Sequence, residues 1–485
     1  MASRSLPSRP NLDQLKRQAD ELRRAHRAGD RSAASRIAAH HPRWKGQPLA
    51  KVLAAALPVG DSQLVLAREY GFDSWAKLKH HVEIGRAVAK FKPHPRFDEA
   101  VAALDAGDLD RLRALIASDP HLVRARTNLE PPYHYFTAAT LLHHVAGNPD
   151  RGRFDGKLPP LPGNTVELSR ALLDSGADVN ATTLGPNGGT LMGLLITSKL
   201  ASDAGLSAPL MDLLLERGAK LDLRTPEALY AALTNHAPRA AEKMLELGAT
   251  PDVLVAAGLG RMDLLRACFD GDGRLNSRPR RHGKAMTERD AIGLAMLFAY
   301  VRKQHDAVDF LLKKRGNWNM IGVNNGTALH RAAWDGDLPM LQRLVAMGAD
   351  ISNRDNPFGS SPFGWANYNK QHAVVQWMRE HCPLDLHDAV SFNLRDHAEA
   401  RLREHPASVN TQIDHWGIPQ ATALHWAAAF NRADLAALLL EQGADANILA
   451  GNGLTALDVA AEEHADEVAA LLERHGAKRA ADLLS

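Results

Sequence analysis

The stretch TALHRAAWDGD covers residues 327–337 and returns, with changes, as TALHWAAAFNR at residues 422–432. A third copy begins at Thr455, and more divergent copies begin at Thr140 and Ser361. The copies at residues 422 and 455 are 33 residues apart, and those at 327 and 361 are 34 apart. Because a fixed period of this length is typical of repeat architectures, the stretch predicts a stack of similar units with one extended core.

The residue types of the stretch suit a pair of packed helices. Its threonine can cap a helix by accepting a hydrogen bond from a backbone N–H group, and the leucine that follows belongs to the core. The pair of alanines leaves no bulk, so two helices can approach closely. A second apolar block follows each copy and ends in a glycine, as at Gly348, Gly443 and Gly476. A glycine at that place supplies the positive φ angle that ends a helix.

Both the period and the motif resemble the ankyrin repeat. The resemblance covers about residues 97–480 and predicts eleven units. Their first helices are expected to begin near Asp98, Thr140, Thr190, Glu227, Pro251, Leu294, Thr327, Ser361, Leu384, Thr422 and Thr455. It implies an all-α fold in which residues 97–485 form an ankyrin-repeat solenoid of helix-turn-helix units. In this family the histidine of the motif, here His143, His330 and His425, is structural; a catalytic histidine is the alternative.

Residues 1–96 do not fit the repeat and predict a helical N-terminal cap. One helix is indicated by the apolar stripe Leu12, Leu15, Ala19, Leu22 and Ala25, with Asn11 as its N-cap. Two more helices are expected after Asp61 and Ser74, which we interpret as their caps. These segments resemble the leader ahead of some bacterial ankyrin-repeat proteins, and that resemblance suggests a bacterial source.

The N-terminal region is also basic. Residues 1–45 hold eleven Lys and Arg against four Asp and Glu, an excess of seven positive charges, whereas the whole chain carries +2. Such an asymmetry is found in proteins that bind nucleic acid or an acidic partner. No interleaved aromatic residues or nucleic-acid module accompany the charge, so a solvated helix face is the favoured interpretation and nucleic acid is an unlikely partner.

Composition excludes several other classes of protein. Hydrophobic residues make up 45% of the chain and charged residues 24%, without an apolar run long enough to span a membrane. The first ten residues have no apolar segment of the kind found in a secretory signal, so we expect none. The two cysteines, Cys268 and Cys382, fit free thiols in a reducing compartment, which favours the cytoplasm. Neither metal-ligand spacing nor a nucleotide-binding glycine pattern is present. We therefore expect no cofactor and no metal.

The two residues after each alanine pair differ between copies. In the ankyrin architecture they lie at the end of the inner helix, on the concave side, where partners commonly bind. Four successive units place an aromatic residue there: Trp334, Tyr368, Phe392 and Phe430. We predict that these four residues, called here the aromatic face, form the binding surface together with Arg302, Asp335 and Asn369. The alternative is that the rings pack on neighbouring loops, called fingers, and only fill the wall.

Two further groups of residues are candidates for binding or chemistry. Tyr133, His134 and Tyr135 lie in the finger before Thr140, and an insertion at 148–164 follows them. If the finger and the insertion closed over one groove, His, Tyr and carboxylate groups could meet for acid–base chemistry; the alternative is a packed finger. The third candidate is the tip of the finger 411–421, formed by Asp414, His415 and Trp416, which could touch a ligand lying on the aromatic face. The alternative is a turn in which Trp416 packs on the next repeat.

These observations lead to one preferred function and one alternative. The preferred function is a cytoplasmic recognition scaffold that binds a protein partner through its concave groove. The alternative is an enzyme or small-molecule receptor with its site near the inserted loops 126–165. The two can be distinguished by structure, since a deep enclosed pocket favours a small ligand and an open groove favours a protein.

Overall fold

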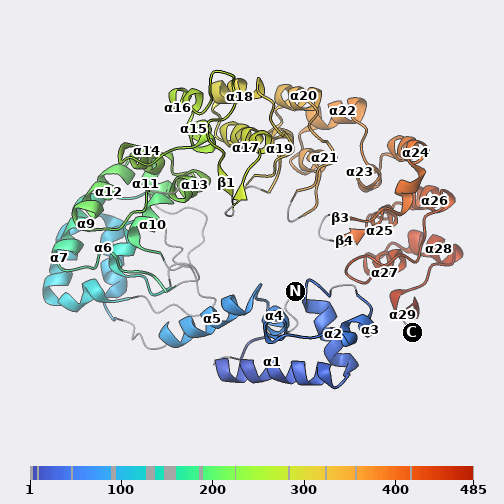
Figure 1. Ribbon diagram of the computed structural model, residues 1–485, viewed down its shortest axis with the longest axis horizontal. Helices are drawn as coiled ribbons and strands as arrows, with labels where there is room; N and C mark the ends of the chain where they lie inside the picture. The colour runs from blue at the N-terminus through green and yellow to red at the C-terminus, as the bar shows by residue number, and fades with distance from the viewer. Residues whose placement is uncertain are drawn as a thin grey trace. The chain divides into compact units, whose positions relative to one another are not determined.

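The computed structural model describes residues 4–7, 10–44, 47–88, 94–126, 137–146, 160–184, 189–223, 226–281, 284–322, 325–355, 358–415 and 418–483. These residues form helices joined by turns and fingers, together with two pairs of short strands (Figure 1). The chain divides into two compact units, Met1–Thr250 and Pro251–Ser485. The fold is an all-α solenoid of helix-turn-helix units, as the sequence predicts.

Unit 1 begins with helices that do not belong to the repeat. They are α1 (Leu12–Arg27), α2 (Arg31–His40), α3 (Leu49–Ala54), α4 (Val59–Glu69) and α5 (Trp75–Val88). The predicted apolar stripe of α1 is buried and packs on α4 and α2, and Asn11 caps α1 by accepting a hydrogen bond from the Asp13 N–H group. The region is helical, as expected, while its predicted boundary after residue 96 stays a prediction.

Details of this region differ from the expectation. Helices α2 and α3 were missed, because each is short and carries only a weak apolar stripe. Asp61 is not the cap of α4, which begins two residues earlier, after Pro58. Ser74 does accept a hydrogen bond, from the Lys77 N–H group at 3.3 Å, so its role as a cap is confirmed.

Part of the basic charge of this region is neutralised internally. The carboxylate of Glu69 is almost fully buried and accepts two hydrogen bonds from Arg36, at 2.7 and 2.9 Å. Arg4 donates to the same carboxylate at 3.3 Å. These contacts tie the N-terminal segment and α2 to the end of α4, so some of the arginines serve the packing of the region itself.

The rest of unit 1 consists of four helix pairs. They are α6 (Phe97–Ala106) with α7 (Leu109–Ser118), α8 (Leu141–His144) with α9 (Thr165–Asp174), α10 (Leu191–Ile196) with α12 (Ser207–Glu216), and α13 (Glu227–Thr234) with α14 (Pro238–Glu246). A short 3-10 helix, η1 (Pro120–Arg124), follows α7, and α11 (Lys199–Asp203) occupies the insertion between α10 and α12. First helices pack on first helices and second helices on second helices, which gives two rows (Figure 1).

Unit 2 continues the same arrangement with seven pairs. They are α15 (Val253–Leu259) with α16 (Met262–Ala267), α17 (Glu288–Val301) with α18 (His305–Leu312), α19 (Ala328–Asp335) with α20 (Leu338–Ala346), α21 (Pro362–Tyr368) with α22 (His372–His381), α23 (Leu386–Ser391) with α24 (Arg395–Glu404), α25 (Ala423–Ala429) with α26 (Ala433–Glu441), and α27 (Ala456–Glu462) with α28 (Asp466–Arg474). In Figure 1 the first helices form the inner row of this unit and the second helices the outer row.

Smaller elements complete unit 2. These are the 3-10 helix η2 (Pro406–Asn410), the final helix α29 (Ala480–Leu483), and the antiparallel strand pairs β1 (Arg280–Arg281) with β2 (Lys284–Ala285) and β3 (Ile413–His415) with β4 (Ile418–Ala421). Each strand pair lies in the finger that precedes an inner helix, α17 for the first pair and α25 for the second.

The predicted number of units is confirmed, since the repeat helices form eleven pairs within the residues that the structure describes. One predicted start is wrong. The inner helix expected near Leu294 begins at Glu288, because the side chain of Thr287 accepts a hydrogen bond from the Asp290 N–H group and caps the helix there. This inner helix is therefore longer than its counterparts, and the template of the motif placed its start too late.

The motif folds through the threonine and the histidine that follows three residues later. In α19 the Nδ1 atom of His330 accepts the Thr327 backbone N–H group at 3.2 Å, while the Thr327 hydroxyl oxygen accepts the His330 N–H group. The other ring nitrogen, Nε2, donates to the carbonyl of Ser360 in the next finger at 3.0 Å. Burial, as the main cause, lowers the pKa of His330 to about 4, so the ring is neutral. The expected structural role is confirmed.

Candidate functional site

The residues of the aromatic face lie at the ends of inner helices in unit 2. Trp334 belongs to α19, Tyr368 is the last residue of α21, and Phe392 and Phe430 follow α23 and α25 directly. The rings of Trp334 and Tyr368 are stacked, with centroids 5.9 Å apart and planes inclined by 23°. The structure thus brings the first two members of the predicted surface together, across two neighbouring units.

The other two rings rest on aromatic residues of the inner helices. Phe392 meets Phe363 edge to face, with centroids 5.2 Å apart, and Phe430 stacks on Trp426 at 5.8 Å. Trp365 supports Trp334 in the same way, edge to face at 5.6 Å. That the four rings form one continuous contact surface stays a prediction.

Sequence reasoning missed the supporting rings. Trp426 precedes Phe430 by four residues, and Trp365 precedes Tyr368 by three, so each pair has the spacing at which side chains on a helix are neighbours. This spacing in the sequence could have identified Trp426 and Trp365 as neighbours of the rings at the helix ends. Phe430 is held in this way by Trp426, whereas Trp334 and Phe392 rest on rings of the neighbouring helix α21.

The four rings of the aromatic face differ in how exposed they are to solvent. Tyr368 is 69% exposed and Phe430 37% exposed, while Trp334 and Phe392 are half-buried. Phe358, in the finger before α21, is 64% exposed and was not predicted. No periodic pattern pointed to Phe358, because it lies in an irregular finger. Large exposed aromatic side chains are unfavourable in water unless they contact something, so Tyr368 and Phe358 are the strongest marks of a binding surface here.

The polar members of the predicted surface have partners within the chain. Asn369 donates from Nδ2 to the carbonyl of Trp334 at 2.7 Å, which ties the end of α21 to the end of α19. Asp335 forms an ion pair with Arg331, one helical turn away, at 2.8 Å. Arg302 follows α17, and burial lowers the pKa of its guanidinium. The remaining predicted residues, Trp416, Tyr133, His134 and Tyr135, lie outside the described residues.

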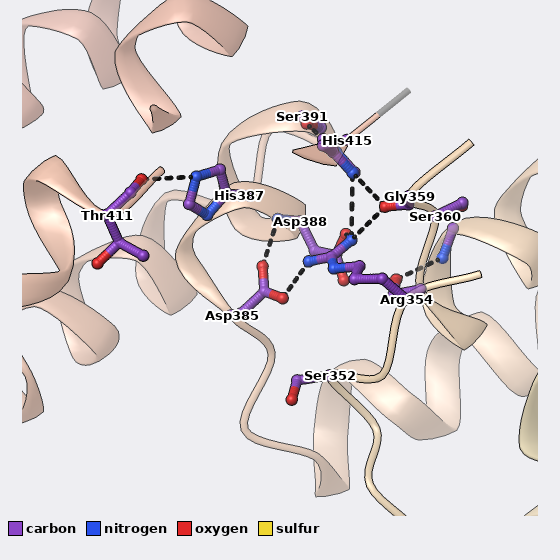
Figure 2. Close-up of polar contacts among 12 residues, drawn as sticks. Ser352, Arg354, Gly359, Ser360, Asp385, His387, Asp388, Ser391, Thr411 and His415 are labelled. Carbon is purple, nitrogen blue, oxygen red and sulfur yellow. Dashed lines mark hydrogen bonds and ion pairs between the residues drawn. The ribbon is translucent and has the colours of Figure 1, made fainter. Parts of the chain in front are cut away.

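A buried polar cluster connects the fingers near the aromatic face (Figure 2). Arg354 donates from Nη1 to Asp388 at 3.0 Å and forms a second ion pair, through Nη2, with Asp385. Ser361, the N-cap of α21, donates its hydroxyl to the other oxygen of Asp388 at 2.5 Å. Both oxygens of the buried Asp388 carboxyl are therefore satisfied, as buried charges require.

His415 extends the cluster to a second finger. Its Nδ1 atom lies 3.1 Å from the carbonyl of Gly359 and 3.2 Å from Nη1 of Arg354, while Nε2 lies 3.2 Å from the Ser391 hydroxyl (Figure 2). The ring also meets Trp426 edge to face at 4.8 Å. Through these contacts the finger before α21 and the finger before α25 are both fastened to α23.

The cluster is suited to structure and not to catalysis. Ser391 and His415 are within hydrogen-bond distance, but they are only 6% and 1% exposed. Burial, and next the charge of Arg354, lowers the pKa of His415 to about 3, so the ring is a poor proton acceptor near neutral pH. Within the part of the chain that the structure describes, no group of three His, Cys, Asp or Glu residues could hold a metal ion.

The two acidic groups of the cluster have different pKa values. Burial, followed by repulsion from Asp385, raises the pKa of Asp388 to about 6. Burial is the largest single influence on Asp385 too and opposes its ionisation, but the electrostatic effects of Arg354 and His387, together with the hydrogen bonds that Asp385 accepts, outweigh it and lower its pKa. The Asp385 carboxylate therefore stays ionised beside Arg354. The ionised form of Asp388 depends on the hydrogen bonds that it accepts from the Ser361 hydroxyl and the Arg354 guanidinium.

Family models describe the same units. Models of ankyrin repeats match residues 295–345 and residues 386–481. These segments are ankyrin repeats. They include the motif at Thr327 and its copies at Thr422 and Thr455. The resemblance stated from the motif is thereby confirmed for the C-terminal half of the chain, where the aromatic face lies.

A solved structure gives a weaker likeness. It is a chain from the complex of a predatory endopeptidase of Bdellovibrio bacteriovorus with an immunity protein. The alignment has 22% sequence identity, covers 39% of this chain and 99% of the other, and has a TM-score of 0.26. A likeness at this TM-score carries no argument about function.

Proposed function

We propose that the chain is a recognition scaffold that binds a protein partner through the aromatic face and the adjoining fingers of unit 2. Ankyrin repeats are generally modules of protein interaction, which is the broad support for this function. The observation that carries the proposal is Tyr368, which is 69% exposed and yet fixed by stacking on Trp334. A rigid exposed aromatic pair is a favourable anchor, because little side-chain entropy is lost when a partner covers it.

The buried cluster supports this function by making the surface rigid. Arg354, Asp388 and His415 hold two fingers against α23, so the fingers beside the aromatic residues need not be ordered when a partner binds. A binding surface that is ordered in advance retains more of its contact energy as affinity.

The proposed location of the scaffold is the bacterial cytoplasm. Cys268 and Cys382 are both free, and burial raises the pKa of each thiol to about 11. Unreactive thiols of this kind fit a reducing compartment. The bacterial source rests on the resemblance of the N-terminal segments alone. Separately, none of the described helices is long and apolar enough to cross a membrane.

The alternative function, an enzyme or receptor near residues 126–165, has less support. Most of the loops concerned lie outside the described residues. The adjacent His144 is described, and it is buried against Phe97, with ring centroids 5.7 Å apart. Burial lowers the pKa of His144 to about 4, and its position in the apolar packing does not favour a role in proton transfer.

A selection from a random peptide library displayed on phage tests the proposal. The full chain should enrich a family of peptides, and W334A and Y368A should each weaken their binding by at least about thirtyfold, the effect of losing a binding anchor. W377A is the matched control, because Trp377 lies in the outer helix α22 and stacks on His381 of its own helix, with ring centroids 5.0 Å apart. Failure to enrich any peptide, or equal losses in all three variants, would count against the proposed surface.

A further inference from the structure

The finger before α17 is strongly basic. Arg278, Arg280, Arg281 and Lys284 all lie within seven residues, and each of them is exposed. These four residues are called here the basic finger. In Figure 1 the strand β1, which carries two of them, lies on the inner side of α17 and α19, away from the outer helices α16 and α18.

The basic finger is held in a defined conformation. Strands β1 and β2 pair Arg280 with Ala285 and Arg281 with Lys284, and the Met286 N–H group donates to the carbonyl of Pro279 at 2.9 Å. Arg281 also donates from Nη1 to the carbonyl of Ile321, in the next finger, at 3.3 Å. The positive charges are therefore presented from a fixed position and joined to the finger that precedes α19.

Ion pairs among the described residues do not account for three of these charges. Within the described residues, Arg278, Arg281 and Lys284 form no ion pair with a carboxylate. Elsewhere in the same unit, arginines do pair with carboxylates, as in Arg261, Arg331, Arg343, Arg354 and Arg395. Three exposed cations without a counter-charge repel one another, and an external anion relieves that repulsion.

The positive charge is confined to one end of the proposed binding surface. Arg302 follows the end of α17, the inner helix that comes after the basic finger. Beyond it, Arg331 is neutralised by Asp335 beside Trp334, and the surface then becomes aromatic. The inner side of unit 2 thus changes from a cationic finger to stacked rings within two units.

We propose that the basic finger binds an acidic segment of the protein partner, adjacent to an apolar or aromatic segment that contacts Trp334 and Tyr368. This inference rests on the proposed function and names the chemistry of the partner. A polypeptide can confine its negative charge to a few residues, as this surface requires. A polynucleotide carries a charge at every phosphate and would therefore place phosphates beside the carboxylate of Asp335.

Two synthetic peptides test the inference by fluorescence polarisation with the full chain. One has four glutamates followed by a tryptophan and a leucine, and the other has glutamines in place of the glutamates. The acidic peptide should bind more tightly, and added salt should weaken its binding. The variant R278S/R281S/K284S should lose about tenfold in affinity for the acidic peptide, the scale of three exposed charge pairs, and nothing for the neutral one.

The matched control is R266S/K313S/R315S. These three cations are exposed on α16 and just after α18, have no ion pair in the described structure, and give the same change in net charge. The control should bind the acidic peptide as the parent does. An equal loss in both variants would show that only net charge matters and would overturn the inference.

Other outcomes separate this inference from the proposed function. If both peptides bind equally and W334A weakens both, the aromatic face stands and the role of the basic finger is overturned. If neither peptide binds although the phage selection succeeds, the inference fails alone. If a single-stranded oligonucleotide of equal charge displaces the acidic peptide at a lower concentration than unlabelled peptide does, the finger is a nucleic-acid site instead.

Discussion

Arg354 illustrates how much one side chain contributes at the scale of the residue. It is the only cation described in contact with both Asp385 and Asp388, and its side chain is 16% exposed. Without it, two buried carboxyl groups would remain close together, and the donors described for them would be the Ser361 hydroxyl and the Asp388 N–H group, with no positive charge. Removing one partner of a buried ion pair costs far more than the pair itself contributes, since the other charge stays uncompensated.

We therefore expect R354M to lower the free energy of unfolding by about 3–5 kcal/mol, measured by urea denaturation at pH 7. R395M is the control, because Arg395 and Glu399 form an exposed pair at 2.8 Å whose loss should cost at most about 1 kcal/mol. The additional change D388N should recover part of the loss caused by R354M, as it removes one of the stranded charges. Similar stability of the two single variants would contradict the role assigned to the cluster.

At the scale of the element, stability depends on how each outer helix packs on its inner helix. Leu439 in α26 is fully buried, and α26 packs on α25. L439A should lower the free energy of unfolding by about 2–5 kcal/mol, because it leaves a cavity that neighbouring helices cannot fill. The same substitution at Leu483, which is 36% exposed in α29, should cost less than about 1 kcal/mol. Equal costs in thermal or urea unfolding would mean that α26 does not pack as described.

The elements were largely predictable, and the reason is local. Caps, alanine pairs and closing glycines act within one helix pair, so the motif located the pairs even where the copies had diverged, as at Ser361. The start of α17 was predicted too late, because it depends on the cap formed by Thr287. The short helices α2 and α3 were missed, because their apolar stripes are too weak to recognise.

The site was predictable only in part. Positions such as Trp334 and Tyr368 followed from their register in the repeat. The cluster of Arg354, Asp388 and His415 did not, because Arg354 and His415 lie in fingers, whose side-chain contacts the motif of the helices does not predict. Phe358 was not predicted for the same reason, since a finger has no periodic sequence pattern.

At the scale of the whole molecule, buried histidines make stability depend on pH. His330 and His387 have pKa values lowered to about 4, mainly by burial, and His415 to about 3. An unfolded chain binds protons at these residues near pH 6.5, whereas the folded chain does not. Acid therefore favours the unfolded state below about pH 6.5, by up to about 1.4 kcal/mol per pH unit for each histidine, until the folded pKa is reached.

We expect the urea concentration at the midpoint of unfolding to fall as the pH is lowered from 6.5 to 4. It should change little between pH 8 and pH 7. Asp388 acts in the opposite sense between its ordinary pKa of 3.8 and about 6, because its raised pKa makes protonation favour the folded state, but the three histidines outnumber it. H387Q should reduce the slope, since one titrating group is lost. A midpoint that is constant from pH 7 to pH 5 would contradict this account.

The hydrogen bonds of the motif have a consequence for engineering the array. His330 Nε2 donates to the carbonyl of Ser360, and His425 Nε2 lies 3.2 Å from the carbonyl of Leu454, so each of these copies requires an acceptor from the next finger. The copy at Thr455 has Asp458 at the same place, and its carboxylate accepts from the Ala480 N–H group at 2.8 Å. Copies with histidine and copies with aspartate are therefore not interchangeable. If they were grafted or reordered, two acceptors or two donors would face each other at the junction. The residue at this position would have to be chosen to match the finger that follows it.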